Sequence, residues 1–328
     1  MKKRGWNTKT IEMTIKLTNA IFNQDGIFNQ YEKAQAETMK AVKKRKQEKH
    51  DNSLKELKET MQPDMMKLIE LATEKGASCW LTSIPLKKCG FRLNKQQWYD
   101  SISIRYDRLP NEIPKKCCCG KDFSVSHSLT CKKGGFVHMR HDAVRDTFAD
   151  LMEEFGKDVR KEPALLPVSG EILPEGSNIK DGARSDISAL SIWSPLCKAF
   201  FDVRVFNPLA TTNWTKDLKK MYTTHENEKK KEYNQRILQI EKGTFTPLVF
   251  SCSGGAGPEA VSLIKHLASL IRDKKQEPYS KVISVIRRRI RFDILRSCNL
   301  SLRGFRGKNV VEPLTELDYE LCNFRDQV

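Results

Sequence analysis

Sulfur and nitrogen ligands suited to a metal ion gather between residues 117 and 131. A structural zinc ion takes four cysteine or histidine ligands in a tetrahedron. Within fifteen positions the chain supplies three cysteines and one histidine, with a glycine after the second cysteine that allows a sharp turn. This spacing predicts a structural zinc site whose ligands are Cys117, Cys119, His127 and Cys131.

Neighbouring residues leave alternatives for two of these ligands. Cys118 could replace either adjacent cysteine, and His138 or His141 could compete with His127. The other six cysteines are scattered singly, which is typical of small buried side chains. Because no apolar stretch follows the basic first residues, we expect a protein that is not secreted and whose thiols are reduced.

A second group of side chains could bind a hard cation. The segment 198–206 alternates so that Asp202 and Arg204 share one face of an otherwise apolar, buried strand. The preceding segment 184–190 also has strand character and contains Asp186, and a turn-prone Trp-Ser-Pro separates the two. A hairpin would bring both carboxylates together, where they could bind magnesium for phosphodiester hydrolysis, although an Asp/Arg ion pair is the simpler alternative.

A lysine is expected to approach the same place from the next helix. Residues 225–241 have a helical pattern whose inward stripe passes through Tyr233, Ile237 and Ile240. One turn earlier the stripe reaches Lys229, so this lysine should lean toward the sheet and could hold a scissile phosphate. The pattern thus assigns Asp186, Asp202, Lys229, Tyr233 and Arg204 to one candidate catalytic centre.

The remaining elements describe how the chain could position these residues. A helix is expected over 142–155, a strand over 246–251, and a helix that opens at Pro258. The order of elements predicts an α/β (α+β) fold with a small mixed central sheet flanked by helices. We expect a helical basic segment at 1–76, a linker with the zinc knuckle at 77–139, the core at 140–275, and a basic helix and tail at 276–328.

Charge points to a polyanionic partner. The 328 residues include 58 Lys and Arg against 41 Asp and Glu, a net charge of +17. Nucleic acid is the first candidate partner, because neutralised phosphates release counterions, and a membrane surface is a weaker one. A helix near 280–298 has an apolar stripe formed by Val282, Ile286, Ile290 and Ile294, and its other face is basic. This pattern predicts phosphate contacts from Arg287, Arg288, Arg291 and Arg296. The alternative is a basic face that is only solvated.

Several functions find no support in the sequence. The glycine turn at 253–257 lacks the Gly-Lys-Ser/Thr ending of a nucleotide-binding loop. Neither the Gly-x-Ser-x-Gly motif of esterases nor the His-Glu-x-x-His motif of metalloproteases occurs.

Together these stretches resemble the restriction-enzyme-like endonuclease of site-specific non-LTR retrotransposons. The likeness covers roughly residues 60–308 and rests on EKGASCWLTSIPL (74–86), the zinc cluster, KGGFVHMRHDAVRD (133–146), DGARSDI (181–187), FFDVRVFNP (200–208) and HENEKKKEY (225–233). In that family this region is a variant of the PD-(D/E)-x-K nuclease core, follows a reverse transcriptase in the same polyprotein, and nicks target DNA to prime reverse transcription.

The resemblance implies roles for individual residues. Asp186 and Asp202 would bind magnesium, Lys229 with Tyr233 would supply the catalytic cation, and Arg204 would support them. DNA, and also element RNA, would be the partners, and the protein would act in the nucleus or in nucleus and cytoplasm. The chain carries Ser185 where the nuclease pattern has proline, and Ala143 where related sequences often carry Glu. A zinc-containing nucleic-acid-binding module without nuclease activity is therefore the alternative function.

Overall fold

The structure of the chain is a computed structural model that describes residues 63–110 and 112–306, together with scattered helical positions between 37 and 55. The chain divides into two compact units, Met1–Met66 and Lys67–Val328. Most of the predicted basic segment 1–76 and the tail after residue 306 lie outside the described residues. The zinc cluster, the sheet and the basic helix belong to the second unit, and the four-part division of the chain stays a prediction.

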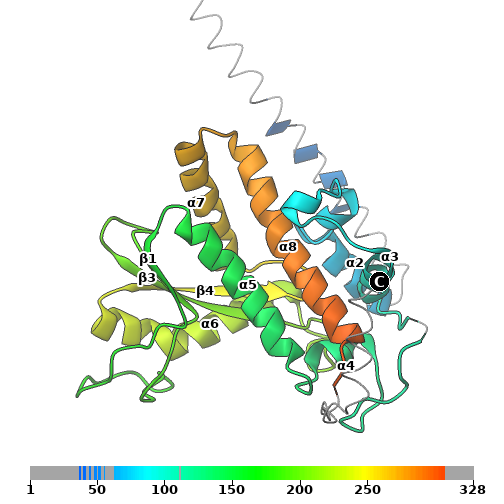
Figure 1. Cartoon of the computed structure of the whole chain (residues 1–328), viewed down its shortest axis with the longest axis horizontal. Coiled ribbons are helices and arrows are strands. Elements are labelled where there is room, and N and C mark those ends of the chain that lie inside the picture. Colours follow the sequence, from blue (N-terminus) through cyan, green and yellow to red (C-terminus); the bar gives the residue numbers. More distant parts are fainter. Residues whose placement is uncertain are drawn as a thin grey trace, which may run out of the picture. The chain divides into compact units, whose positions relative to one another are not determined.

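The described residues form seven α-helices and a four-stranded mixed sheet, which confirms the predicted fold class (Figure 1). Two short 3-10 helices, η1 (Cys79–Thr82) and η2 (Lys87–Cys89), lie between the first two α-helices. In chain order the main elements are α2 (Pro63–Thr73), α3 (Lys95–Arg105), α4 (Val125–Thr130), α5 (Phe136–Glu153), β1 (Lys157–Lys161), β2 (Ile187–Leu190), β3 (Lys198–Phe206), α6 (Leu218–Arg236), β4 (Thr244–Ser251), α7 (Pro258–Lys275) and α8 (Tyr279–Arg303).

The sheet has the strand order β1-β2-β3-β4. The predicted hairpin is confirmed, because β2 pairs antiparallel with β3 and Ile187 lies opposite Phe201. β4 then pairs parallel with β3, so α6 is the crossover between them. β1 was not predicted. Its sequence, KDVRK, has no apolar alternation because this edge strand is mostly exposed along its length.

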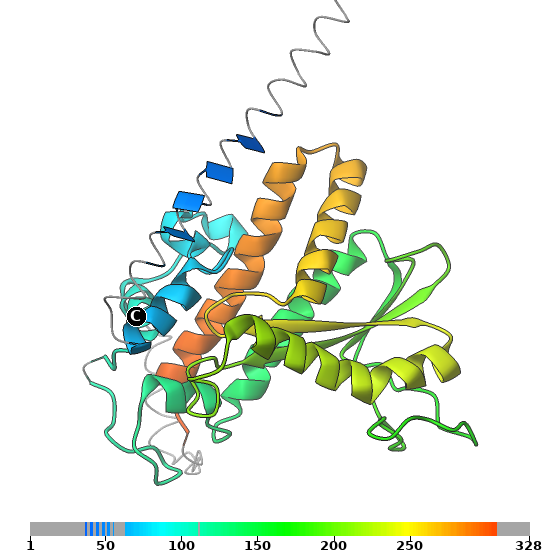
Figure 2. The ribbon, with the colours of Figure 1, turned by 180° about the vertical axis from the view of Figure 1, so that it is seen from behind.

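Helices cover both faces of the sheet, as the two opposite views make visible (Figures 1 and 2). On one face Phe201 and Val203 of β3 belong to the main core, together with side chains of α5, α7 and α8. On the other face Phe200 packs with Tyr233 and Ile237 below α6. The predicted helices are confirmed but begin earlier than expected, α5 at Phe136 and α6 at Leu218.

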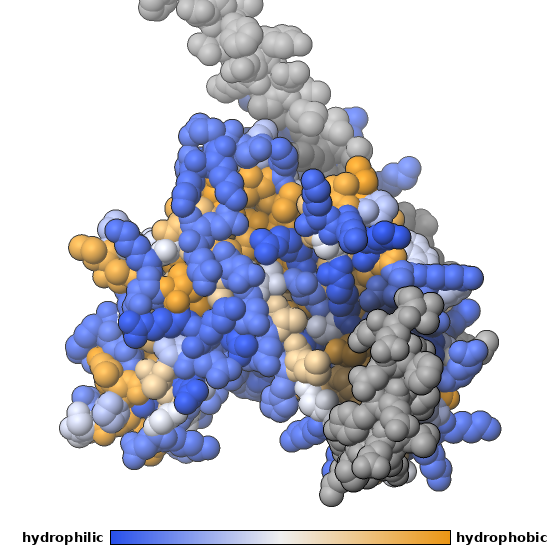
Figure 3. Space-filling view, in the orientation of Figure 1, coloured by the Kyte–Doolittle hydropathy of each residue, from blue (hydrophilic) through white to orange (hydrophobic). Residues whose placement is uncertain are grey.

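Helix α8 differs most from its predicted role as a basic surface helix. Its predicted stripe of Val282, Ile286, Ile290 and Ile294 is buried in the main core. A second side of α8 is covered as well, because Phe292 and Leu295 pack against Trp80 and Phe91. Figure 3 shows hydrophobic side chains gathered between α7 and α8 and bordered by hydrophilic residues.

Candidate functional site

A tight loop and a short helix form the cysteine and histidine cluster. The loop closes through a hydrogen bond from the Gly120 N–H to the Cys117 carbonyl (2.8 Å), and Gly120 adopts a φ of 85°, which favours glycine. Helix α4 is capped by Ser124, whose Oγ accepts from the His127 N–H at 3.0 Å. His127 and Cys131, four positions apart, therefore lie on one side of this helical turn.

The four predicted ligands meet. The ligand atoms of Cys117, Cys119, His127 and Cys131 all lie within 4.8 Å of one another. Cys119 Sγ is 3.4 Å from His127 Nε2, and Cys117 Sγ is 3.8 Å from Cys131 Sγ. Burial opposes ionisation of Cys117, but hydrogen bonds to the Cys119 backbone and the His127 ring outweigh it and lower the pKa of the thiol to about 6. The cluster could hold a metal ion, and its chemistry is compatible with zinc.

The alternative ligands point elsewhere. The Cys118 thiol donates a hydrogen bond to the Arg306 carbonyl (3.1 Å), which ties the loop to the segment that follows α8. His138 is exposed on α5, and His141 contacts Asp186 instead of the cluster. Neither Cys118 nor these two histidines belong to the metal-binding group.

Asp186 lies where β2 begins to separate from β3. Its backbone N–H donates to the Phe201 carbonyl (3.1 Å). Its Oδ2 accepts a hydrogen bond from the Val203 N–H at 2.6 Å, so the side chain continues the pairing that the backbone of β2 no longer provides. Ser185, just before it, is buried, and its hydroxyl donates within the same hairpin. The carboxylate of Asp186 is thereby held beside β3, next to Asp202.

Asp202 forms a buried contact with Lys229, as the helical phase of α6 predicted. The Lys229 Nζ lies 3.0 Å from Asp202 Oδ2, and the Asp202 side chain is only 6% exposed. The contact lacks hydrogen-bond geometry, so Oδ2 remains a buried oxygen without a hydrogen-bond donor. Burial raises the pKa of Asp202 to about 6, the charge of Asp186 adds to this rise, and Lys229 opposes it. Two acidic groups and one cation thus share a small, poorly solvated space.

The two supporting residues have distinct contacts. Arg204 lies on the same face of β3 as Asp202 and donates to Glu228 Oε2 of α6 at 2.5 Å. Tyr233 packs below Lys229, whose Nζ is 5.4 Å from the centre of the ring. Burial raises the pKa of Tyr233 to about 12, with Asp202 as a further cause. Both residues therefore fix the position of α6 over the carboxylates.

His141 belongs to this centre, a place that the sequence pattern did not predict for it. Its Nε2 lies 2.9 Å from Asp186 Oδ2, and its Nδ1 lies 3.2 Å from Asp142. Burial opposes protonation, but the hydrogen bond and charge of Asp186 outweigh it and raise the pKa of His141 to about 9. Helical periodicity could have predicted this position, because His141 precedes Val144 by three positions and Phe148 by seven and so shares their inward face.

The basic residues of α8 divide into two groups. The prediction that Arg291 faces phosphates is wrong: this side chain is buried and donates to the carbonyls of Ala77 (2.9 Å) and Cys252 (3.3 Å). Arg296 donates to the Gly90 carbonyl and is partly exposed. Arg287 and Arg288 are also partly exposed and line open hollows beside residues 75–79. The covering of α8 by residues 77–91 is the physical reason for the difference.

Among the described helices, none is both long and apolar enough to cross a membrane. No protein-family model matches the sequence. A search of curated proteins likewise found no significant match.

Proposed function

We propose that this chain is a magnesium-dependent DNA endonuclease with an active centre built from Asp186, Asp202 and Lys229. The observation that carries the proposal is the buried contact of 3.0 Å between Lys229 and Asp202, with the Asp186 carboxylate bound to the next residue of β3. An isolated ion pair would balance its own charges. Here a second carboxylate, Asp186, adjoins the pair, with the His141 ring 2.9 Å from its Oδ2. Two carboxylates therefore gather in a poorly solvated place, where a metal ion would bind both in competition with the cations of His141 and Lys229.

The residues present fit magnesium. This ion prefers oxygen ligands and binds through one or two carboxylates while it keeps several waters. Asp202 Oδ2 is buried, and the Lys229 ammonium lies 3.0 Å from it, so a bound ion would share this carboxylate with Lys229. Asp186 and Asp202 would hold the ion, which would supply an activated water and stabilise the leaving oxygen.

The side chains of α6 would act on the DNA. Lys229 would direct a positive charge at the scissile phosphate, where charge develops during the reaction. The Tyr233 ring below it and the Asp202 carboxylate beside it restrict the ammonium to one direction. Arg204 would preserve this arrangement by anchoring α6 through Glu228.

The cysteine and histidine cluster is proposed to bind zinc as a structural ion. It would join α4 to the loop of residues 115–123, whose backbone groups pair around the loop ligands Cys117 and Cys119. In line with the resemblance to retrotransposon endonucleases, we propose that the nick primes reverse transcription by a polymerase domain of the same polyprotein, in the nucleus. DNA would be the substrate, and element RNA a second partner.

A plasmid-nicking assay with added magnesium tests the proposal. We expect conversion of supercoiled DNA to open circles by the wild type and none by Asp202→Asn. Lys229→Met should lose about 10²–10³-fold in rate. The matched controls are Lys230→Met, which removes the neighbouring lysine that pairs with Glu259, and Asp158→Asn on the exposed edge strand. Both controls should nick at the wild-type rate, and a control that lost activity as fully as its partner variant would contradict the assignment.

The two contacts of Asp186 Oδ2 favour a binding module without nuclease activity as the second candidate. Asp186 Oδ2 already accepts from the Val203 N–H and contacts the His141 ring, so the oxygen nearest β3 has two partners. Ala143 on α5 offers no carboxylate in compensation. A wild-type chain that binds DNA in a gel-shift assay yet never nicks it with magnesium or manganese would support this candidate over the nuclease.

A further inference from the structure

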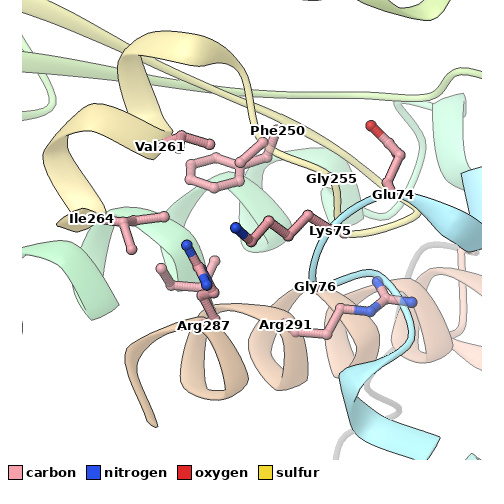
Figure 4. A pocket seen from close by; sticks show the side chains of 12 residues that line it. Glu74, Lys75, Gly76, Phe250, Gly255, Val261, Ile264, Arg287 and Arg291 are labelled. Atoms are coloured by element: carbon pink, nitrogen blue, oxygen red, sulfur yellow. The ribbon is translucent and has the colours of Figure 1, made fainter. Parts of the chain in front are cut away.

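A small pocket is lined by residues of α7, α8 and the segment 74–76, and its lining includes neither Asp186 nor Asp202 (Figure 4). It has a volume of about 120 Å³. Its apolar walls include Phe250 of β4 and Val261 and Ile264 of α7, and the glycine turn after β4 forms its rim. The pocket is smaller than the roughly 300 Å³ of typical small-molecule sites, so it suits a single chemical group better than a whole metabolite.

Two cations point into this pocket. In Figure 4 the Lys75 amine and the Arg287 guanidinium approach each other below the Phe250 ring. Neither side chain forms an ion pair with any residue that the structure describes. Two like charges in one hollow repel each other, and an anion between them would remove that repulsion.

The nearest acid does not neutralise these cations. Glu74 is turned away from Lys75 in Figure 4. Its carboxyl accepts hydrogen bonds from the Tyr222 hydroxyl (2.7 Å) and the Ser251 hydroxyl (3.4 Å). Burial raises the pKa of Glu74 to about 7, which further reduces its negative charge near neutrality.

A wider hollow adjoins the pocket and continues its charge. It has a volume of about 550 Å³ and shares Lys75, Gly76 and Arg287 with the pocket. Lys265 of α7 and Arg288 of α8 line it as well, and none of its lining residues is acidic. The Arg288 Nε is buried without a hydrogen-bond partner. We call the pocket and this hollow together the basic groove.

We propose that the basic groove binds the sugar-phosphate backbone of a nucleic acid and that one phosphate sits in the pocket between Lys75 and Arg287. The size of the pocket matches one phosphate group, while the adjoining hollow lets the strand continue past Lys265 and Arg288. A free phosphate compound would need only the pocket, whereas the line of four cations fits a chain of phosphates. The inference goes beyond the proposed nuclease, since a chain without nuclease activity would still bind through this groove.

Salt-dependent binding of the full chain to fluorescent duplex DNA tests the groove. Affinity is measured by anisotropy between about 50 and 300 mM KCl without added divalent ions, so that loss of nuclease activity cannot affect the result. Lys75→Ala/Arg287→Ala should weaken binding and reduce the log-log salt slope by about one, because the two cations share one phosphate. The charge-conserving variant Lys75→Arg/Arg287→Lys should retain most of the wild-type salt slope.

The matched control removes the same net charge from the same two-helix region. Arg272→Ala/Lys281→Ala removes exposed cations of α7 and α8 that pair with Asp273 and Glu277, outside the basic groove. This control should leave the slope nearly unchanged, and equal thermal melts would show that all variants fold. A slope unaffected by Lys75→Ala/Arg287→Ala, or lowered equally by the control, would overturn the inference.

A second measurement separates the two sources of phosphate. Titration calorimetry with inorganic phosphate alone should give only weak binding to the wild type. If inorganic phosphate bound tightly and depended on Lys75 and Arg287 while the DNA salt slope did not, the pocket would serve a free phosphate compound. That result would refute the nucleic-acid assignment.

Discussion

Replacing Glu74 with glutamine tests the buried network beside the basic groove. Burial raises the pKa of this carboxyl from an ordinary 4.5 to about 7, although hydrogen bonds from Tyr222 and Ser251 oppose the rise. Glutamine keeps an oxygen that can accept from the Tyr222 hydroxyl, now 2.7 Å away from Oε1. The substitution therefore removes the titration and retains most of the contacts.

The expected effect follows from the difference between the folded and unfolded protein. Between pH 4.5 and about 7 the folded protein holds a proton that the unfolded chain has released. Stability consequently falls as pH rises through this window, and the loss is complete above it. The free energy of unfolding changes by about 1.4 kcal/mol per pH unit, so the wild type loses roughly 3 kcal/mol of stability over the whole window. About 2 kcal/mol of this loss falls between about pH 5.5 and 8. Glu74→Gln should not show this loss.

Urea unfolding at about pH 5.5 and about pH 8 measures the effect. Between about pH 5.5 and about pH 8, the urea midpoint of the wild type should fall by about 0.7 M more than that of Glu74→Gln, for a slope of about 3 kcal/mol per molar urea. Glu153→Gln, at an exposed carboxyl of α5, serves as the control and should follow the wild type. Midpoints of Glu74→Gln and wild type that change in parallel would refute the reasoning, because Glu74 would then not titrate in this range.

Two further predictions concern the cysteine cluster and α8. Metal analysis of the purified protein should find about one zinc per chain, because folding of so small a loop is coupled to metal binding. Cys131→Ser should lose the zinc and Cys118→Ser should retain it. A Cys118→Ser protein without zinc would contradict the ligand set. Arg291→Met should cost about 2–4 kcal/mol of unfolding free energy, because it leaves the Ala77 and Cys252 carbonyls without their donor. Its DNA salt slope should match wild type, and a slope lowered as in the basic-groove variants would instead restore Arg291 as a phosphate contact.

The sequence by itself was sufficient wherever a feature depends on neighbouring residues. The four cysteine and histidine ligands lie within fifteen positions, and a turn and one helical turn bring them together. Strand alternation put Asp202 on one face of a buried strand, and helical periodicity placed Lys229 one turn from Tyr233. Both periods are fixed by backbone geometry, so they hold without knowledge of the fold.

Only the tertiary structure decided features that depend on which elements pack together. Arg287 and Arg291 lie one turn apart on α8, yet Arg287 lines an open groove while Arg291 is buried, because residues 77–91 cover only part of the helix. Likewise, β1 exists as a polar edge strand because β2 offers it a pairing partner. His141 meets Asp186 across forty-five positions of sequence. Periodicity gives the direction of a side chain, but the neighbour that it meets is set by long-range packing of hydrophobic surfaces, which no local pattern records.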